Sequence, residues 1–317
     1  SFPTRRSSDL TPITEDRQPQ FAYGDNLVVK GNNLLALCSI LKKFEGRIKC
    51  IYIDPPFNTD KDSFKYNDRF ARSTWLSFMK TRLEIAKRLL SDDGLIYIHI
   101  DYNQAHYLKV LCDEVFDEDN FVNEIIWAYR IQGISKNAWP KKHDTILLYA
   151  KNSQQFRFYS EKEIIKYEKP FIDTKVIAPD MSKLSDKDKN EIITCIEKKE
   201  PLKDKFKEKV FNSYYSEVFV RDVWDQDSTK PMISGSSEYR DFRTQKPEGL
   251  LRRVIESATE ENEYVLDFFG GSGTTAATAM KLKRKFITIE QMDYQMELIC
   301  QRLKDVMLGE QNGISKM

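Results

Sequence analysis

The sequence predicts an α/β protein with a mostly parallel, doubly wound sheet that is interrupted by one long insertion. The first observation is that short apolar, β-branched runs alternate with amphipathic helical periods, which is typical of a parallel sheet covered by helices. The second is that this alternation stops after residue 150 and resumes near residue 244. The third is the length of 317 residues with 40% hydrophobic residues, which is enough for one large domain with a core and an insertion.

The first half of the predicted domain, residues 21–150, contains alternating helices and strands. Gly31–Asn33 can start a helix, and the apolar run 48–53 is a buried strand that ends at Asp54. Thr74 is a candidate N-cap for the next helix. A turn at 92–94, a strand at 95–100, a helix at 103–115 and strands at 122–129 and 144–150 complete this half.

Residues 151–243 have a different texture, because lysine is frequent, glycine is scarce and the apolar periodicity is weak. The charged stretch 181–210 predicts two helices separated at Pro201. Long insertions in compact domains are usually functional or disordered, so we expect this region to have a role of its own. A solvated surface excursion without a role is the alternative.

Residues 244–310 return to the α/β pattern. Pro247 suits the first turn of a helix, and a strand at 264–268 leads into a glycine-rich loop. A helix at 274–283, a strand at 285–289 that ends at Glu290 and a helix at 293–307 follow. Residues 311–317 are expected to form a tail.

The N-terminal residues 1–20 are predicted to lie outside the fold. The first ten, SFPTRRSSDL, are similar to the translation of a common sequencing-adapter oligonucleotide. This similarity indicates an assembly artefact joined to a truncated gene. A disordered polar tail is the alternative, and both interpretations leave the segment without a function.

Bulk properties exclude several classes of protein. No run of about 18 apolar residues occurs, so we expect no membrane-spanning helix. The net charge of +1 means that any nucleic-acid surface must be built locally from Lys and Arg. The five cysteines are scattered without a CxxC pair, and the three histidines lack ligand spacing. This pattern favours reduced thiols in a cytoplasmic protein and no metal site.

A glycine-rich loop follows the strand at 264–268. Its run Gly271-Ser272-Gly273-Thr274-Thr275-Ala276 has the G-x-G-x-x-G/A spacing that lets a ligand approach the backbone at a helix N-terminus. Glu290 lies about 20 residues later, where an acid can accept both hydroxyls of a ribose. The pattern fits a nicotinamide, a flavin or S-adenosylmethionine, and a glycine-rich turn that binds nothing is the alternative.

The tetrad Asp54-Pro55-Pro56-Phe57 follows the strand at 48–53, at the sheet edge where open α/β sheets bind ligands. The two prolines stiffen the backbone and remove two N–H donors, so the Asp54 carboxylate and the Pro55 carbonyl can both accept from one amino group. Phe57 offers a stacking face, worth about 1–3 kcal/mol per base, which offsets part of the cost of flipping a base out of a duplex. A strand-ending turn without chemistry is the alternative.

Six segments, in this order, are similar to the β-class of amino-DNA methyltransferases: GNNLLAL, IYIDPPFNTDKDSFKYND, STWLSFMKTRLEIAKRLLSDDGLIYIHID, KHDTILLYAK, TQKPEGLLRRVIESAT and VLDFFGGSGTTAATAM. The sequence most resembles the modification subunits of type III restriction systems and related adenine methyltransferases. The resemblance covers residues 25–305 except 151–220. It implies the Rossmann-like fold of S-adenosylmethionine-dependent methyltransferases. Residues 21–150 would be its catalytic half, 151–243 its target recognition insertion and 244–310 its cofactor-binding half.

The resemblance also implies the site residues. Asp54, Pro55, Pro56 and Phe57 form the catalytic motif, and Gln245, Lys246 and Pro247 lie against the methionine end of S-adenosylmethionine. The family often has Tyr where Phe57 stands, and Ala or Cys where Gly270 stands; Phe57 keeps the stacking and loses only a hydroxyl. The other expected cofactor-binding residues are Asn32, Asp267, Phe269, Gly270, Gly271, Gly273, Thr274 and Glu290.

An acid at the first position of the tetrad is the habit of N6-adenine enzymes in this family, and a serine is the habit of N4-cytosine enzymes. Asp54 therefore predicts a site-specific DNA methyltransferase that modifies N6 of adenine, with N4 of cytosine as an alternative. A Rossmann-type nicotinamide oxidoreductase would explain Gly271, Gly273 and Glu290 but would leave the tetrad without a role. A non-catalytic DNA-binding relative would be expected to lose Asp54 or the glycines. A protein or RNA amino-methyltransferase would normally have the glycine motif before the tetrad.

Double-stranded DNA is the expected partner. The resemblance further implies a restriction subunit and a second copy of the chain as partners. Basic residues of 127–243 are candidate phosphate contacts, although a solvated charged face explains most of them. The candidates are Arg130, Lys136, Lys141, Lys142 and Arg221.

Overall fold

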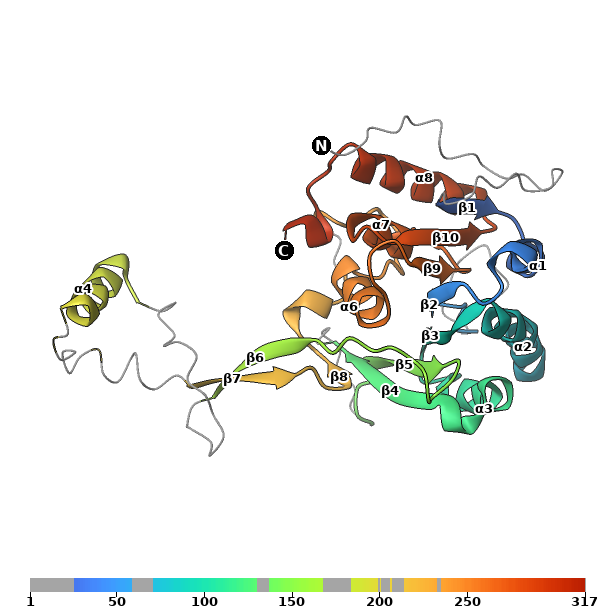
Figure 1. Cartoon of the computed structure of the whole chain (residues 1–317), viewed down its shortest axis with the longest axis horizontal. Helices are drawn as coiled ribbons and strands as arrows, with labels where there is room; N and C mark the ends of the chain where they lie inside the picture. The colour runs from blue at the N-terminus through green and yellow to red at the C-terminus, as the bar shows by residue number, and fades with distance from the viewer. Residues whose placement is uncertain are drawn as a thin grey trace. The chain divides into compact units, whose positions relative to one another are not determined.

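The structure is a computed structural model of the chain, and it describes residues 26–58, 71–129, 137–167, 184–198, 200, 206, 214–232 and 235–316. The chain forms two compact units. The smaller unit is Ser160–Arg221, and the larger unit is formed by the segments on both sides of it. The elements of both units are labelled along the chain in Figure 1.

An eight-stranded sheet organises the larger unit. Its strands are β1 (Leu27–Lys30), β2 (Ile48–Ile53), β3 (Leu90–Ile100), β4 (Phe121–Ala128), β5 (His143–Ala150), β8 (Val223–Trp224), β9 (Tyr264–Asp267) and β10 (Lys285–Glu290). Their order is β1-β10-β9-β2-β3-β5-β4-β8. The strands from β1 to β3 in this order are parallel. β5 runs antiparallel to both β3 and β4, and β8 is parallel to β4.

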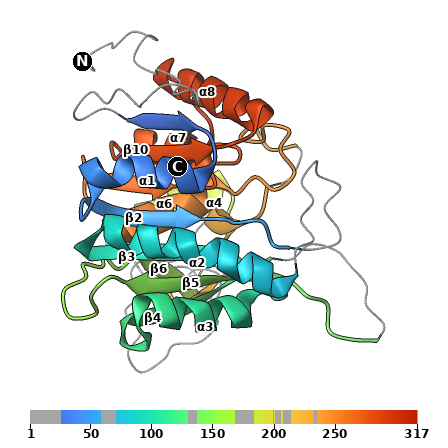
Figure 2. The same cartoon turned by 90° about the vertical axis from the view of Figure 1, so that its right-hand side faces the viewer.

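Helices cover both faces of this sheet. They are α1 (Asn33–Phe44), α2 (Arg72–Leu89), α3 (Ala105–Phe116), α6 (Glu248–Ala258), α7 (Thr274–Lys281) and α8 (Asp293–Met307), with 3-10 turns η2 (Glu118–Asn120), η3 (Asp227–Thr229) and η4 (Gly313–Lys316). α1, α2 and α3 lie side by side on one face, in front of β2, β3 and β5 in Figure 2. α6 and α7 lie on the opposite face, and α7 also packs against α8. These layers confirm the doubly wound α/β fold. None of the helices in the described segments is long and apolar enough to span a membrane.

The core of the larger unit lies between the sheet and its helices. Leu37 and Ile40 of α1 and Leu83 of α2 are fully buried in one apolar cluster with the strand residues Ile51 and Ile98. The central strands β2 and β3 are buried on both faces, as their continuous apolar sequence predicts. The carboxyl ends of these strands are therefore fixed by packing that is independent of any ligand.

Two local predictions are wrong. The segment 92–94 is not a free turn but an irregularity inside β3, since Ile48 pairs with Leu90 and Cys50 pairs with Leu95. Between these two pairs β2 advances by two residues and β3 by five. The additional residues of β3 therefore have no partner on β2 and form a bulge. α2 begins at Arg72 with no side-chain cap. Its first helical hydrogen bond already runs from the Trp75 N–H to the Ala71 carbonyl at 3.1 Å, so Thr74 lies inside the first turn.

The remaining boundaries agree with the sequence to within a few residues. α6 begins at Glu248, so Pro247 is its N-cap residue and not part of its first turn. β1 and β8, with four and two residues, are strands that the sequence analysis does not predict. The fold prediction therefore holds at the level of layers, and its errors are confined to short or irregular elements.

The smaller unit contains two strands that the sequence does not reveal. β6 (Lys162–Tyr167) and β7 (Tyr214–Phe219) form an antiparallel pair. α4 (Asp186–Glu197) confirms the first of the two charged helices, and a small buried cluster contains Leu184, Ile192 and Phe206. The second charged helix, predicted beyond Pro201, falls almost entirely outside the described residues.

Candidate functional site

Three carboxylates gather at the carboxyl edge of the sheet. Asp54 directly follows β2, Asp267 ends β9 and Glu290 ends β10, and these three strands are parallel neighbours. They border one cleft and a small cavity that adjoins it beneath the glycine loop. The structure thus brings together the tetrad and the glycine loop. The cleft is lined by Asn33, Asp54, Pro55, Pro56, Phe57, Phe78, Phe242, Thr244, Lys246, Phe268, Phe269, Gly271, Ile289, Glu290, Gln291 and Gln295.

The two oxygens of the Asp54 carboxylate have different surroundings among the described residues. Its Oδ2 accepts a hydrogen bond from the Lys246 Nζ at 2.5 Å. Its Oδ1 is buried and has no hydrogen-bond partner among the described residues. Buried polar atoms are almost always satisfied, so an unpaired acceptor beside a cleft indicates a place for a donor from outside the chain.

The rest of the tetrad is held by buried neighbours. Trp75 of α2 donates from its Nε1 to the Pro56 carbonyl at 2.9 Å, which fixes the turn after β2. The Phe57 ring lies nearly parallel to the His99 ring, with centroids 6.1 Å apart and 18° between the planes. The Lys246 Nζ lies 5.4 Å from the centroid of the Phe57 ring. Phe57 therefore has an aromatic neighbour behind it and lines the cleft.

A buried polar chain supports His99, and the sequence does not reveal it. The His99 ring is fully buried; its Nδ1 lies 3.0 Å from the Tyr52 hydroxyl, and its Nε2 lies 3.2 Å from the Asp144 Oδ2. Burial alone would raise the pKa of Asp144, but its contact with His99 and the charge of Lys246 hold that pKa below the usual range. The three partners come from β2, β3 and β5, so only the strand pairing could have shown that they meet.

The glycine loop needs its glycines at defined positions. Gly271 and Gly273 have φ of 52° and 73°, a left-handed conformation that L side chains rarely adopt. A Cβ added to Gly273 would lie 3.0 Å from Ile299 Cγ1. A Cβ on Gly270 would lie 2.6 Å from the Thr288 hydroxyl, so the Ala or Cys of relatives does not fit here without a shift of Thr288. The close packing brings the backbone to the cleft at the N-terminus of α7.

Asp267 holds the glycine loop from its buried side. Its Oδ1 accepts from the Phe269 N–H at 2.9 Å, and its Oδ2 accepts from the Thr275 hydroxyl at 2.6 Å. Burial raises the pKa of Asp267 to about 7, and the charges of Asp54 and Glu290 act in the same direction. This carboxyl therefore binds a proton near neutral pH, which an exposed aspartate does not.

Glu290 accepts hydrogen bonds from three backbone N–H groups. They belong to Gly271 at 2.9 Å, Gln291 at 2.7 Å and Met292 at 2.9 Å. With its amide oriented to donate, Gln295 Nε2 lies 2.7 and 3.2 Å from the two carboxylate oxygens. Burial raises the pKa of Glu290 in spite of the backbone bonds. Gln295 thus donates to both oxygens of the carboxylate that the sequence predicts to bind ribose hydroxyls.

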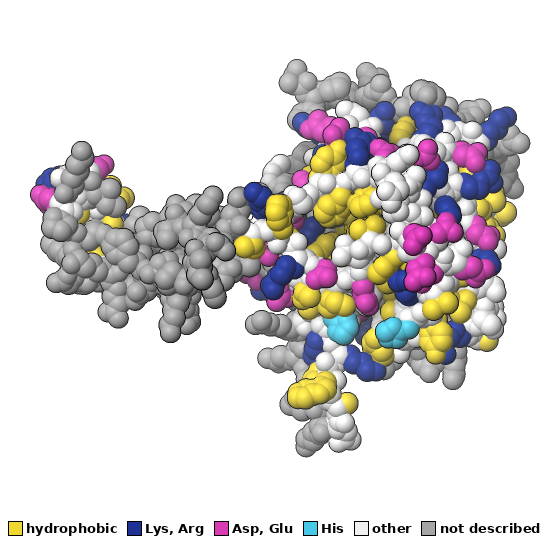
Figure 3. All heavy atoms as spheres, turned by 60° about the horizontal axis from the view of Figure 1, so that its bottom comes forward, with side chains coloured by type: hydrophobic (Ala, Val, Ile, Leu, Met, Phe, Trp, Pro, Cys, Tyr) yellow, Lys and Arg dark blue, Asp and Glu magenta, His cyan; other side chains and the backbone are white. Residues whose placement is uncertain are grey.

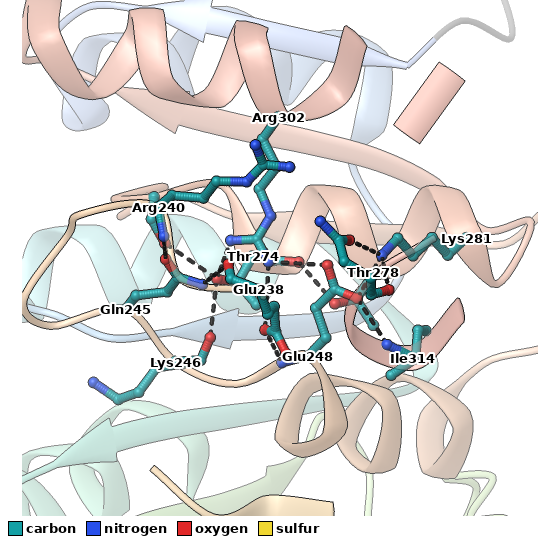
Figure 4. A network of polar contacts seen from close by, with 12 residues as sticks. Glu238, Arg240, Gln245, Lys246, Glu248, Thr274, Thr278, Lys281, Arg302 and Ile314 are labelled. Atoms are coloured by element: carbon teal, nitrogen blue, oxygen red, sulfur yellow. Dashed lines mark hydrogen bonds and ion pairs between the residues drawn. The ribbon is translucent and has the colours of Figure 1, made fainter. Parts of the chain in front are cut away.

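A buried charge network fixes the backbone at Lys246. The fully buried Glu248 carboxylate accepts from Arg302 Nη2 at 2.9 Å and from Lys281 Nζ at 2.7 Å. Arg302 Nη1 also donates to the Thr274 hydroxyl at 2.9 Å, and that hydroxyl donates to the Lys246 carbonyl at 3.1 Å. Figure 4 shows the Lys246 carbonyl directed toward this network and its ammonium directed away from it. The network therefore holds the backbone while the side chain extends into the cleft.

Asn32 does not line the cleft. Its Oδ1 accepts from the backbone N–H groups of Leu34 at 3.0 Å and Leu35 at 3.4 Å, so it caps α1. Its neighbour Asn33 lines the cleft instead and donates from its Nδ2 to the Phe268 carbonyl at 3.0 Å. Asparagine is a preferred N-cap residue, and two asparagines stand next to each other here, so the sequence pattern alone does not show which of them caps the helix.

The other predicted cofactor-binding residues either line the cleft or the adjoining cavity, or pack against the residues that do. Gln245 is buried and donates from its Nε2 to the Glu238 carbonyl at 2.9 Å, so it shapes the loop before Lys246. Pro247 follows as the N-cap residue of α6, and Gly273 packs beneath the loop on Ile299. Lys246, Phe269, Gly271 and Glu290 line the cleft, and Asp267, Gly270 and Thr274 line the adjoining cavity.

The predicted phosphate contacts are partly described. Lys141 is exposed, and its Nζ lies 3.6 Å from the centroid of the Tyr102 ring. Lys142 is half-buried, and Arg221 is exposed in the smaller unit. Acidic and basic side chains are intermixed among the coloured residues of the face in Figure 3, as the net charge near zero suggests. Arg130 and Lys136 lie outside the described residues.

The five cysteines are free thiols. Cys50, Cys112 and Cys195 are buried, Cys300 is half-buried and Cys38 is exposed. Burial raises the pKa of Cys50 and of Cys112, which makes these thiols unreactive. In the segments that the structure describes, no three His, Cys, Asp or Glu side chains converge as ligands for a metal ion.

A family model described as DNA methylase (N6_N4_Mtase) matches residues 48–301, a range that contains the whole cleft except Asn33. The HindVI Mod subunit of Haemophilus influenzae, described as a probable type III restriction-modification enzyme, is 35% identical over 98% of this chain and 53% of that subunit. The chain therefore spans about half the length of this relative. The DNA adenine methyltransferase YhdJ of Escherichia coli K12 is 23% identical, over 80% of this chain and 76% of its own.

Solved structures share the fold. A protein of Thermus thermophilus described as a DNA modification methylase, complexed with S-adenosyl-L-methionine, has a TM-score of 0.54 at 16% identity and covers 89% of this chain and 95% of its own. The cytosine-N4-specific PvuII DNA methyltransferase has a TM-score of 0.52 at 15% identity, and the match covers 92% of this chain and 95% of that enzyme. The fold, the meeting of the two motifs and the family match over residues 48–301 agree with one another. The chain belongs to the DNA methylase family.

Proposed function

We propose that this chain is an S-adenosylmethionine-dependent DNA methyltransferase that acts on N6 of an adenine in duplex DNA. The observation that carries the proposal is the buried, unpaired Oδ1 of Asp54 at a cleft shared with the glycine loop. An exocyclic amino group is a donor of the kind that this oxygen lacks. Membership of the DNA methylase family and the similarity to a Mod subunit and a DNA adenine methyltransferase support the same reaction.

The cleft residues fit S-adenosylmethionine. Gly271 has a positive φ, which a residue with a side chain rarely adopts. The resulting loop leaves the backbone at the N-terminus of α7 open to a ligand. Phe269 and Ile289 offer apolar contact to an adenine ring, and Glu290 offers a carboxylate to the ribose. Lys246 offers a cation to the amino-acid end. When bound, the cofactor would supply an electrophilic methyl group on a sulfonium.

Asp54 and the turn that follows it are proposed to position the target amine. The Asp54 carboxylate and the Pro55 carbonyl accept its two N–H groups, which draws the nitrogen toward a tetrahedral geometry and exposes its lone pair. This lone pair would accept the methyl group that the bound sulfonium supplies, and the electron pair of the broken C–S bond would stay with the cofactor. The positive charge passes to the nitrogen, which then loses a proton to Asp54 or to water.

Phe57 is proposed to stack on the flipped base. Its ring is backed by His99, which Tyr52 and Asp144 hold in place. A stacking surface that is already ordered costs little entropy when the base arrives. Stacking worth about 1–3 kcal/mol offsets much of the few kcal/mol needed to extrude a base from the duplex.

Adenine is proposed as the target base for two reasons. An acid, Asp54, opens the tetrad, as in the adenine enzymes that the sequence resembles, and one relative is named a DNA adenine methyltransferase. The fold does not choose between bases, since a cytosine-N4-specific enzyme shares it, so N4-cytosine is the alternative outcome. A nicotinamide oxidoreductase would give no role to the unpaired oxygen of Asp54, and family membership argues against it.

Duplex DNA is the proposed partner, and the cytoplasm is the expected location. Residues 151–243 are proposed as the target recognition insertion between a catalytic half at 21–150 and a cofactor-binding half at 244–310. Most of this insertion coincides with the smaller unit, Ser160–Arg221. The similarity to a Mod subunit supports a restriction subunit as a further partner, and a second copy of the chain is proposed on the resemblance alone.

The test is transfer of a tritiated methyl group from S-adenosylmethionine into unmethylated DNA, followed by nucleoside analysis and mapping of the modified sites. N6-methyladenine at one short motif is the expected result, with transfer by the Asp54→Ala variant reduced by about 10²–10⁴-fold. N4-methylcytosine would overturn the base but keep the mechanism. A chain that binds the cofactor and duplex DNA but transfers no methyl group would contradict the proposed activity.

A further inference from the structure

We propose, building on the function above, that Lys246 exchanges partners during the reaction cycle. In the ligand-free chain it pairs with Asp54, and when the cofactor is bound it pairs with the carboxylate of the cofactor's amino-acid end. Cofactor binding thereby frees the Asp54 carboxylate for the target amine. Lys246 is a positioning residue that makes capture of the base follow binding of the cofactor.

The ion pair stands where the target base has to bind. The Lys246 Nζ lies 2.5 Å from the Asp54 Oδ2, and the side chains are 11% and 21% exposed. The ammonium therefore covers one of the two carboxylate oxygens. It also lies 5.4 Å from the centroid of the Phe57 ring, which is the proposed stacking surface. The target amine is proposed to donate to the neighbouring Oδ1, so the ammonium competes with it for the charge of the same carboxylate and lies beside the face on which the base stacks.

The charges of the cleft make the exchange necessary. Among the described residues that line the cleft, Lys246 is the sole cationic side chain, and two acids, Asp54 and Glu290, line the same cleft. A cofactor that brings a carboxylate into this cleft finds one cation, and that cation is already engaged. An ammonium left on Asp54 would also repel the sulfonium of the cofactor. Moving the ammonium to the incoming carboxylate removes both conflicts and keeps one ion pair.

The side chain of Lys246 can move while its backbone stays fixed. Its carbonyl accepts from the Thr274 hydroxyl at 3.1 Å, and that hydroxyl is held by Arg302. Figure 4 shows the side chain directed away from these contacts. Lysine has a flexible four-carbon stem and a compact ammonium with three donors, so the ammonium can turn from one carboxylate to another without a movement of the loop.

The test compares two ligands by isothermal titration calorimetry. S-adenosylhomocysteine has the amino-acid end, and 5′-methylthioadenosine lacks it; both are neutral thioethers. Asp54→Asn is expected to bind S-adenosylhomocysteine roughly tenfold more tightly than the wild-type chain, because no ion pair has to open, within the usual range of coupling between sites. Lys246→Met is expected to bind it about 10- to 100-fold more weakly. Neither variant should change the affinity for 5′-methylthioadenosine, and the exposed-lysine control Lys304→Met should match the wild type for both ligands.

Two outcomes would overturn the inference. Equal affinity for S-adenosylhomocysteine in Asp54→Asn and the wild type would show that the lysine does not leave Asp54. No loss in Lys246→Met would show that it does not meet the carboxylate. Failure of the proposed function is a separate result: the wild-type chain would then bind neither ligand, or would bind them and transfer no methyl group to DNA. Where Asp54→Asn also alters 5′-methylthioadenosine binding, Asp54→Ser replaces it, and the same tenfold gain is required.

Discussion

Removing the Glu248 carboxylate should destabilise the larger unit far more than removing an exposed carboxylate. Glu248 is fully buried and accepts from Arg302 at 2.9 Å, from Lys281 at 2.7 Å and from the Ile314 N–H at 3.1 Å. Glu248→Ala leaves two buried cations without their shared counter-charge. Breaking a buried charge network by deleting one partner costs about 3–5 kcal/mol. A change of about 1 kcal/mol shifts the unfolding temperature of a domain of this size by about 2–4 °C, so a loss of about 6–20 °C is expected.

The measurement is urea unfolding followed by tryptophan fluorescence, together with thermal unfolding. Glu261→Ala is the control: this glutamate pairs with Lys283, but both side chains are more than half exposed, and such a pair contributes only about 0–1 kcal/mol. Glu248→Gln keeps the shape and loses the charge, so it should fall between the wild type and Glu248→Ala. If Glu248→Ala unfolded at the same urea concentration as Glu261→Ala, the network would be solvated and the reasoning would be wrong.

Three further predictions concern the cleft. Asp54→Ala should reduce methyl transfer by about 10²–10⁴-fold while cofactor binding persists, and full activity would refute its role. Phe57→Ala should weaken the flipped-base complex by about 1–3 kcal/mol and duplex binding by less, as measured by 2-aminopurine fluorescence beside anisotropy; equal losses would count against stacking. Asp267 has a folded pKa of about 7, above its ordinary value of 3.8, so it binds a proton more tightly when folded. Its contribution to the free energy of unfolding should therefore fall as pH rises from about 4 to about 7, by several kcal/mol at most. Asp267→Asn should flatten that part of the pH profile, and an unchanged slope would contradict the assignment.

The sequence predicts those site residues that stand at the carboxyl ends of strands. Asp54, Asp267 and Glu290 each stand at or just after the end of an apolar run, and parallel strands bring such ends to one edge. The Asp54–Lys246 pair joins residues 192 positions apart, and no local pattern specifies which cation meets the carboxylate. His99 and Asp144 are likewise ordinary residues of two strands until the antiparallel pairing of β3 and β5 places them together.

Other misses have local causes. Asn32 and Asn33 are adjacent and identical in type, and only the backbone at the start of α1 decides which one caps the helix. The turn expected at 92–94 is absorbed into β3, because pairing with β2 on both sides of it outweighs the turn preference of Asp-Asp-Gly. The strands of the smaller unit contain lysine, glutamate and serine among their apolar residues, so their alternation is too weak to indicate a strand.

The two ends of the smaller unit are tied to each other. β6 and β7 pair in register from Lys162 with Phe219 to Tyr167 with Tyr214, and the Val220 N–H donates to the Glu161 carbonyl at 3.0 Å. The hairpin thus holds Tyr167 and Tyr214, the two ends of the intervening chain, beside each other, and the entropy of closing a chain segment rises only slowly with its length. We therefore expect insertions or deletions between the two strands to leave the pairing of β6 and β7 intact, so that this part of the chain can change in length while its attachment points stay the same.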